Sequence, residues 1–152
     1  MRTIKRDIVV ALIYSKDGKL LMGWRDNKGG VYPECWHIPG GGVEEGESNE
    51  EAIIREIKEE VGLDLSGYTI EFVGNEDKGT AEKILKDTGE KVLVDMQFFL
   101  YKIVITDQLS SEITLQVSDE FTKTQWFTIS ELSTVKLAQP SEKYFRKVGY
   151  IK

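Results

Sequence analysis

Three glutamates, Glu56, Glu59 and Glu60, lie close together in a segment whose pattern predicts a helix. At about 100° of rotation per residue, Glu60 falls beside Ile53 and Ile57, and the other two lie further round on the same side of that apolar stripe. Carboxylates crowded against a buried stripe repel one another and lose solvation unless a cation lies between them. Geometry alone leaves two interpretations open, a metal site or the solvated face that most charge runs form.

The glutamates belong to a longer pattern in residues 41–63, in which Gly41, Glu47 and Arg55 precede them and Gly62 follows. This segment resembles the Nudix box, G-x5-E-x7-R-E-U-x-E-E-x-G-U with U aliphatic, at every position. If each fixed residue has a usage of about one in fifteen, a chance match is on the order of one in 10⁸ per starting point. The preceding residues 36–40 also resemble the entry to this box. The sequence is therefore identified as that of a Nudix family member.

The resemblance implies a role for each charged residue of the box. It implies that the metal ligands, direct or through water, are three helix carboxylates and a backbone carbonyl: Glu56, Glu59, Glu60 and Gly40. Arg55 is expected to orient the carboxylates and support catalysis, and Glu47 to brace the loop against the helix, although both could form a simple surface ion pair. All-oxygen ligands favour Mg²⁺, with Mn²⁺ as a substitute. Zinc is not expected from a chain with one Cys and one His.

The resemblance does not fix the general base. Glu56 and Glu59 are candidates, and Glu120 is a third because Nudix enzymes often place a further acid on a late loop shortly before an aromatic residue. Glu120 could bind the metal or activate water, and an ordinary exposed loop acid is the alternative. Asp119 and Glu112 compete for the same role.

Candidates for contacting substrate lie outside the box or at its start: Arg25, Trp36, His37 and Gly41. Arg25 ends a predicted strand, where a guanidinium can clamp phosphates, and a solvated strand-end Arg is the alternative. Trp36, like Tyr32 and Trp126, could stack on a base, although core packing is the commoner use of such rings. His37 has no partner pattern for Ser or Cys nucleophilic catalysis. Glycines 40–42 alone would be a weak indication of a phosphate loop.

Local signals place the box on a helix between strands. Ser48 can cap a helix while Glu51 reaches back to it, and Gly62 suits the C-terminal position, so we expect a helix over residues 48–61. Strand patterns predict an opening hairpin and later strands over residues 4–14, 20–24, 68–74, 92–105 and 125–128, with residues 84–85 pairing back across a turn. A helical turn at 130–132 and a closing helix at 142–148 complete the chain. Loops 26–34, 74–83 and 107–120 are expected to set substrate identity.

The resemblance implies an α/β fold, an α/β/α sandwich with a mixed sheet between the box helix and the closing helix, in a single domain over residues 1–152. The net charge of −6 does not favour nucleic-acid binding. The longest apolar run, residues 8–14, is far too short to span a bilayer, and no cleavage site follows it. With one cysteine and no secretory signal, a cytoplasmic location is expected. A homodimer stays open.

The function implied is Mg²⁺-dependent hydrolysis of a nucleoside diphosphate linked to another group, with a nucleoside triphosphate as the first choice of substrate. Monophosphate and pyrophosphate would be the products. Hydrolysis of a dinucleotide or a sugar nucleotide is the enzymatic alternative. A Nudix-like module that senses nucleotides without cutting them is the other alternative, and the intact set Arg55, Glu56, Glu59 and Glu60 argues against it.

Overall fold

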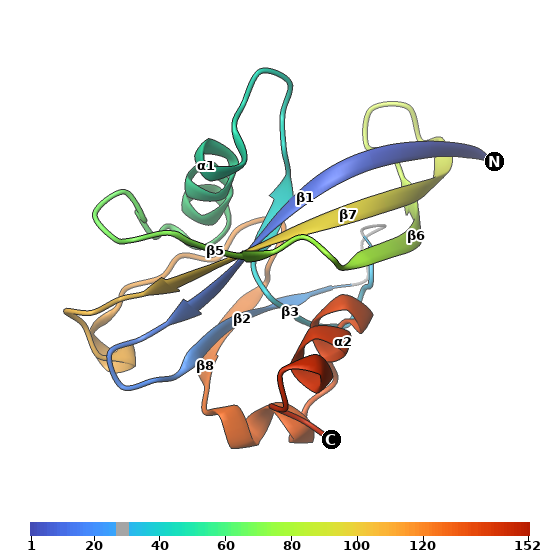
Figure 1. The fold of residues 1–152 in the computed structure, drawn as a ribbon. Coiled ribbons are helices and arrows are strands. Elements are labelled where there is room, and N and C mark those ends of the chain that lie inside the picture. The colour runs from blue at the N-terminus through green and yellow to red at the C-terminus, as the bar shows by residue number, and fades with distance from the viewer. Residues whose placement is uncertain (27–30) are drawn as a thin grey trace.

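A mixed sheet between two helices forms the framework of the computed structural model, which describes residues 1–26 and 31–152 (Figure 1). The strands run in the order β3-β2-β1-β7-β5, and β4 also pairs with β1, β6 with β7 and β8 with β2. In chain order the elements are β1 (Arg2–Tyr14), β2 (Leu20–Arg25), β3 (Cys35–His37), β4 (Gly40–Gly42), α1 (Asn49–Val61), β5 (Glu71–Gly74), β6 (Lys78–Ile84), β7 (Lys91–Val104), β8 (Lys123–Phe127) and α2 (Gln139–Lys147), with short 3₁₀ helices at Ser110–Glu112 and Ile129–Thr134.

The two longest strands, β1 and β7, run parallel and divide the core into two layers. Successive strand residues point to opposite faces. Val9 and Ile13 of β1 pack with Ile53 in a cluster on the α1 side, whereas Leu12 packs with Phe145 in a cluster on the α2 side. Figure 1 shows α1 and α2 on opposite sides of the sheet. The predicted α/β/α sandwich with a mixed sheet is confirmed.

The opening hairpin forms as predicted, but its strands pair only next to the turn, at Tyr14 and Leu20. Further along β1, the short strand β4 takes the place of β2, with register pairs from Ile8 with Gly42 to Val10 with Gly40. A Cβ on Gly40 would lie 2.0 Å from the Val9 carbonyl oxygen, so only glycine permits this approach. The glycines that open the box are therefore part of the sheet.

The α1 helix begins and ends where the local signals predict. Ser48 Oγ accepts a hydrogen bond from the Glu51 amide at 3.1 Å, and the Glu51 carboxylate accepts one from the Ser48 amide at 3.0 Å. Gly62 adopts a φ of 75° and donates its amide to the Lys58 carbonyl at 3.0 Å. The predicted capping box and glycine stop are both confirmed.

The prediction of a loop over residues 74–83 is wrong, because β6 occupies Lys78–Ile84 and pairs with β7 along its whole length. Its sequence, KGTAEKI, contains Lys, Gly, Ala and Glu, which are weak strand formers. Pairing with a long and largely buried neighbour stabilises it as a strand. The smaller prediction at the turn holds, since the Leu85 amide donates to the Glu90 carbonyl at 2.9 Å.

Two element boundaries also differ from prediction. The strand predicted over 68–74 begins only at Glu71, because the Tyr68 amide donates to the Leu65 carbonyl in a preceding turn. The closing helix begins earlier than predicted, at Gln139, with Pro140 in its first turn, where a missing amide proton costs little. Of the predicted loop 26–34, residues 27–30 lie outside the described residues.

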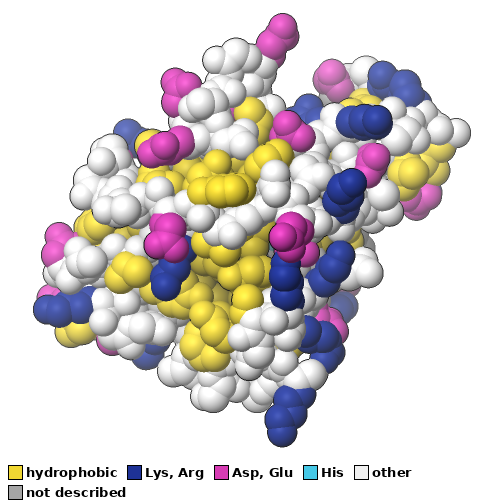
Figure 2. Space-filling model, viewed as in Figure 1, with side chains coloured by type: hydrophobic (Ala, Val, Ile, Leu, Met, Phe, Trp, Pro, Cys, Tyr) yellow, Lys and Arg dark blue, Asp and Glu magenta, His cyan; other side chains and the backbone are white. Residues whose placement is uncertain are grey.

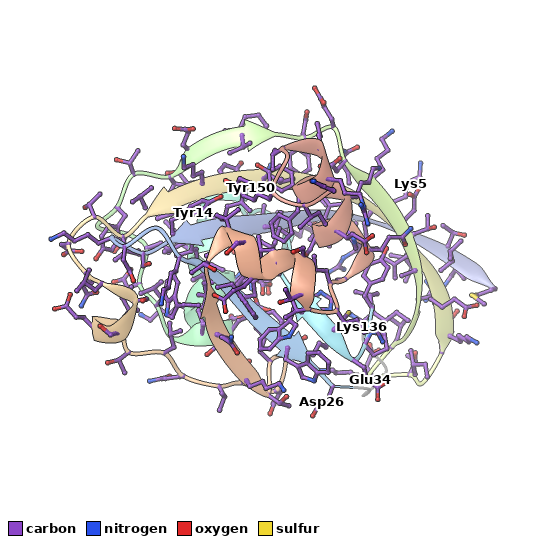
Figure 3. The ribbon with its side chains drawn as sticks, turned by 90° about the horizontal axis from the view of Figure 1, so that it is seen from below. Lys5, Tyr14, Asp26, Glu34, Lys136 and Tyr150 are labelled. Atoms are coloured by element: carbon purple, nitrogen blue, oxygen red, sulfur yellow. The ribbon has the colours of Figure 1, made fainter. Side chains whose placement is uncertain are left out.

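The C-terminal segment returns to the sheet. The hydroxyls of Tyr14, at the end of β1, and Tyr150, after α2, lie 2.7 Å apart and share a hydrogen bond (Figure 3).

Figure 2 shows positive and negative side chains interspersed around a hydrophobic centre on one face. No helix in the described parts of the chain combines the length and apolar character needed to cross a membrane.

Candidate active site

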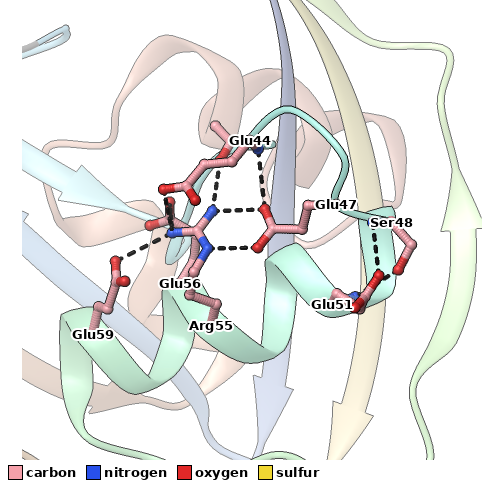
Figure 4. Close-up of polar contacts among 8 residues, drawn as sticks. Glu44, Glu47, Ser48, Glu51, Arg55, Glu56 and Glu59 are labelled. Carbon is pink, nitrogen blue, oxygen red and sulfur yellow. Dashed lines mark hydrogen bonds and ion pairs between the residues drawn. The ribbon is translucent and has the colours of Figure 1, made fainter.

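Arg55 is the centre of a polar network on the exposed side of α1 (Figure 4). Its Nε and Nη2 donate to the two oxygens of Glu47 at 2.7 and 2.9 Å, and Nη2 also donates to the Gly42 carbonyl at 3.0 Å. Its Nη1 donates to Glu56 at 2.9 Å and to Glu59 at 3.2 Å. The hydrogen bonds from Arg55 lower the pKa of Glu47 to about 2. Arg55 thus ties the box loop to the helix and holds two box glutamates.

Glu60 lies on the other side of the same helix and is only 2% exposed. One carboxylate oxygen accepts the Gly40 amide at 2.9 Å, and no residue in the described ranges forms an ion pair with it. Burial, and then the charge of Glu56, raise the pKa of Glu60 well above its usual value, against a smaller opposing effect of Arg25. The interior therefore contains a carboxylate whose charge the chain does not fully compensate.

Glu56 lies between these two environments. Burial raises its pKa, and the neighbouring Arg55 guanidinium partly opposes the rise. A Cβ on Gly41 would lie 2.3 Å from the Glu56 carboxyl carbon, so the glycine lets this carboxyl group lie directly against the β4 backbone. The glycine thus permits a close approach between the β4 backbone and the box helix.

Glu56 and Glu60 of α1 line a cavity of about 300 Å³ that α2 also lines. Seven of the predicted site residues line it: Arg25, His37, Gly40, Gly41, Glu56, Glu60 and Glu120. Four others, Trp36, Glu47, Arg55 and Glu59, are not in its lining. The structure thus brings together residues from five separate segments of the chain and leaves the Arg55 network at the rim.

Arg25 and Glu120 lie together at this cavity. An Arg25 Nη donates to the Val31 carbonyl at 3.1 Å, and the other lies 3.8 Å from the Glu120 carboxylate. The second Glu120 oxygen lies 3.7 Å from Lys86 Nζ. The competing acids Asp119 and Glu112 do not line the cavity. Among these three loop acids, only Glu120 is therefore within reach of a bound ligand.

His37 is a largely buried residue of the cavity lining, and its ring is hydrogen-bonded to the backbone. Its Nε2 lies 2.6 Å from the Tyr32 carbonyl oxygen, and because a carbonyl only accepts, Nε2 carries the proton. Burial, helped by the charge of Arg25, lowers the pKa of His37 to about 3. The ring is neutral at pH 7 and fixes the position of Tyr32.

The two tryptophans considered for base stacking do not reach the cavity. Trp36 is 7% exposed and packs edge-to-face against Trp24 and Phe127, with ring centroids 5.6 and 5.0 Å away. Trp126 packs against the core cluster on the α1 side. The core-packing alternative is the correct one for both rings. Trp36 is a buried core residue with edge-to-face aromatic neighbours, and Trp126 is partly buried against the core.

Several cavity residues are not singled out by any motif, although Asp77 and Lys83 lie in the segment 74–83 that is expected to set substrate identity. They come from β1, β6, β7, α2 and the segment before β6: Arg6, Asp77, Lys83, Phe98, Ser141 and Tyr144. None belongs to a motif. Only strand pairing between distant segments brings them beside the box, which is why local patterns could not find them.

The donor set suits a hard divalent cation. No three Asp, Glu, His or Cys side chains in the described part of the chain are arranged to hold a metal ion. The bonds from Arg55 to Glu56 and Glu59 account for this, because they draw those carboxylates toward the guanidinium. Glu56 and Glu60 nevertheless leave buried negative charge beside the cavity, and carboxylate oxygens are the ligands that Mg²⁺ and Mn²⁺ prefer.

Comparison with known families gives the class of this protein. A family model described as the NUDIX domain matches residues 4–148. The chain belongs to the NUDIX family, as its box predicts, and it is a NUDIX hydrolase. Hydrolases of this family generally use divalent metal ions.

Among its relatives are two proteins named "Nucleoside triphosphatase NudI". One, from Salmonella newport (strain SL254), is 36% identical over 135 residues, which cover 88% of this chain and 89% of the relative. The other, from Enterobacter sp. (strain 638), is 29% identical over 147 residues, covering 97% of this chain and 99% of the relative.

Solved structures confirm the fold. The MutT protein from Methanosarcina mazei Go1 aligns with a TM-score of 0.61 at 21% identity, covering 98% of this chain and 96% of that one. The E. coli dihydroneopterin triphosphate pyrophosphohydrolase aligns with a TM-score of 0.63 at 18% identity, covering 97% and 99%.

Proposed function

We propose that this NUDIX hydrolase cleaves nucleoside triphosphates to nucleoside monophosphate and pyrophosphate, with Mg²⁺ as its metal ion. The similarity over nearly the whole chain to proteins named nucleoside triphosphatase carries the proposal. The cavity agrees with it, because the carboxylates of Glu56 and Glu60 lie in one lining with the guanidinium of Arg25. In such a lining, the carboxylates can bind a cation and the guanidinium can bind phosphate oxygens.

The residues that would hold Mg²⁺ are three glutamates of the box, Glu56, Glu59 and Glu60, and the carbonyl of Gly40 just before it. When bound, the ion neutralises negative charge that develops on the phosphate oxygens during hydrolysis. Arg55 holds Glu56 and Glu59 in place through its bonds at 2.9 and 3.2 Å. Arg25 orients the polyphosphate, since its guanidinium lines the cavity and its contact with Glu120 is a long one.

We assign Glu120 as the general base that takes a proton from the attacking water. Of the three candidates, Glu59 does not line the cavity and Glu56 is hydrogen-bonded to Arg55, whereas Glu120 lines the cavity with its side chain 48% exposed. Water can reach it. Its two carboxylate oxygens lie 3.8 Å from Arg25 and 3.7 Å from Lys86.

A substrate panel tests the proposed function. The protein is incubated with Mg²⁺ and, separately, ribo- and deoxyribonucleoside triphosphates, dinucleotides and sugar nucleotides, and pyrophosphate and phosphate release are measured. Pyrophosphate from triphosphates is the expected product. In ¹⁸O-labelled water, label should enter only one product, because one phosphorus is attacked and no side-chain nucleophile intervenes. Binding of these nucleotides without label in any product would favour a sensing module instead.

The base assignment has its own test. Glu120→Gln should lower kcat by about 10²-fold, within the usual range for general-base catalysis. The limb of the pH–rate profile that reports the base should disappear with it. Asp119→Asn is the matched control, because the neighbouring acid does not line the cavity. A Glu120→Gln protein with full turnover would return the role to Glu56 or Glu59.

A further inference from the structure

Away from the box, the cavity lining changes character. Phe98 and Leu100 of β7, together with Ile38 and Tyr144, supply apolar and aromatic surface there. Phe98 and Leu100 are 6% and 4% exposed, so the surface rests on the rigid core of the sheet. Such a lining cannot solvate phosphate, but it matches the flat faces of an aromatic ring system.

Two of the aromatic side chains meet over a glycine. A Cβ on Gly79 would lie 3.1 Å from the Tyr32 hydroxyl and 3.1 Å from Phe98 Cε2. The bare backbone of β6 at this point lets the phenol of Tyr32 reach the Thr80 carbonyl, to which it donates at 3.2 Å. Tyr32 therefore bridges from the loop before β3 to β6 and forms one wall of the cavity beside Phe98.

The backbone around Tyr32 is held in an unusual conformation. Tyr32 and Glu34 have φ values of 48° and 57°, in the left-handed region that residues with a side chain rarely adopt. His37 Nε2 and Cys35 Sγ both donate to the Tyr32 carbonyl, at 2.6 and 3.0 Å. These hydrogen bonds hold the cavity wall that Tyr32 forms in one conformation.

Asp77 adds one polar group to this end of the cavity. Its backbone carbonyl accepts the Phe98 amide at 3.0 Å, which places it next to the aromatic surface. Its carboxylate lines the cavity and forms no hydrogen bond or ion pair with any residue of the described ranges. A carboxylate repels phosphate and only accepts hydrogen bonds, so its partner in a ligand must be a neutral or positive donor.

We propose that this part of the cavity, Tyr32, Asp77, Phe98 and Tyr144, binds the nucleobase of the substrate, with a ring N–H or amino group donating to Asp77. The proposal rests on the proposed function for the position of the triphosphate. The two charged regions orient the substrate: phosphates bind at Arg25 and the box carboxylates, and the base binds at Asp77, where phosphates are excluded. Asp77 is thus a specificity-determining residue.

Asp77→Asn provides the first test, because the amide keeps the shape and removes the charge. kcat and KM are measured with ATP, GTP, CTP, UTP, their deoxy forms and inorganic tripolyphosphate, which has no base. We expect Asp77→Asn to lower kcat/KM for the best nucleotide by about 10- to 100-fold, mainly through KM. Tripolyphosphate kinetics should not change. Asp95→Asn is the matched control, since Asp95 lies on β7 opposite Thr80 but does not line this cavity.

Tyr144→Leu tests the aromatic surface and should raise KM for the nucleotide by about 10-fold, as expected from losing one stacking contact. Melting temperatures of all variants establish that they fold. Isothermal titration with nucleoside monophosphate and with pyrophosphate gives a readout that needs no turnover. In Asp77→Asn, weakened binding of the monophosphate with unchanged binding of pyrophosphate supports the subsite.

Two results would overturn the subsite. One is an Asp77→Asn protein whose nucleotide kinetics and monophosphate affinity match the wild type. The other is an equal loss toward nucleotide and tripolyphosphate, which would place Asp77 at the phosphates. Failure of the proposed function looks different: the wild type would then release no pyrophosphate from any triphosphate, and the titrations alone would decide whether a base binds here.

Discussion

Glutamates on the two sides of α1 have different electrostatic surroundings. On the exposed side, Glu47 receives two hydrogen bonds from Arg55, which also holds Glu56 and Glu59. On the buried side, Glu60 receives only a backbone amide from Gly40. In the first arrangement, the guanidinium of Arg55 lies among the carboxylates and is hydrogen-bonded to three of them. The second leaves charge that a bound cation can neutralise.

Because of this difference, we expect the Arg55 network to contribute mainly to stability and Glu60 mainly to catalysis. A network whose members are hydrogen-bonded to one another stabilises the folded chain, and removing any member leaves its partners unpaired. A buried carboxylate without a counter-charge destabilises the folded chain, and a bound cation relieves this destabilisation. Substitutions on the two sides of α1 should therefore affect turnover and stability in different proportions.

The largest expected effect is on turnover. Glu59→Gln or Glu60→Gln should lower kcat by about 10³-fold with Mg²⁺, since several kcal/mol of metal-dependent stabilisation of the transition state is lost. Glu50→Gln, at an exposed position in the first turn of α1, is the control and should not change kcat. Steady-state kinetics at saturating nucleotide measures the effect. Near-wild-type turnover in either variant would contradict its assignment as a metal ligand.

On the exposed side, Arg55→Lys should cost about 2 kcal/mol of unfolding free energy, because an ammonium cannot reproduce the paired bonds to Glu47 together with those to Gly42 and Glu56. Urea denaturation measures it. Arg146→Lys is the control: Arg146 also pairs with a glutamate, Glu142, but at the surface, where such pairs contribute less than about 1 kcal/mol. Equal losses in both variants would reduce the Arg55 network to an ordinary surface contact.

The helix could be predicted from the sequence because its signals are local. Ser48, Glu51 and Gly62 fix the ends of α1, and periodicity places Glu60 beside Ile53. The box resemblance then identifies which acids matter. Every one of these inferences uses residues within about a helix length of one another.

The rest of the cavity depends on pairing between distant segments. Asp77 reaches the cavity because the backbone before β6 bonds to Phe98 of β7, and Tyr144 because α2 packs on that face. The β6 strand itself escaped prediction, since its half-exposed composition resembles a loop. Trp36 shows the reverse error, because an aromatic residue beside the box suggests stacking until its packing against Trp24 and Phe127 is known.

His37 is another buried titratable group, and its lowered pKa predicts how the stability of the folded chain changes with pH. The pKa of His37 is lowered to about 3 in the folded chain, against about 6.5 unfolded, so the unfolded state binds more protons between these values. Its contribution to stability is present above about pH 6.5 and is lost as the pH falls toward 3. Between pH 7 and pH 5, wild type should lose about 2 kcal/mol more than His37→Gln, which cannot titrate. Parallel urea curves for the two proteins would contradict the buried, neutral assignment.

The smallest expected effect is a change in stability, and it tests the comparison most directly. Removing a glutamate charge should stabilise the folded chain on the buried side of α1 and destabilise it on the exposed side. Glu60→Gln keeps the shape and the acceptor for the Gly40 amide but removes the uncompensated charge, so in EDTA it should raise the unfolding free energy by about 1 kcal/mol. Glu47→Gln removes a charge that Arg55 matches, so it should lower the melting temperature. Millimolar Mg²⁺ should stabilise wild type more than Glu60→Gln, because the variant has lost a ligand. Thermal melts with EDTA and with Mg²⁺ measure all three quantities, with Glu50→Gln as the neutral control. A Glu60→Gln protein less stable than wild type in EDTA would mean that the chain already compensates Glu60, with Arg25 as the cation whose field reaches it.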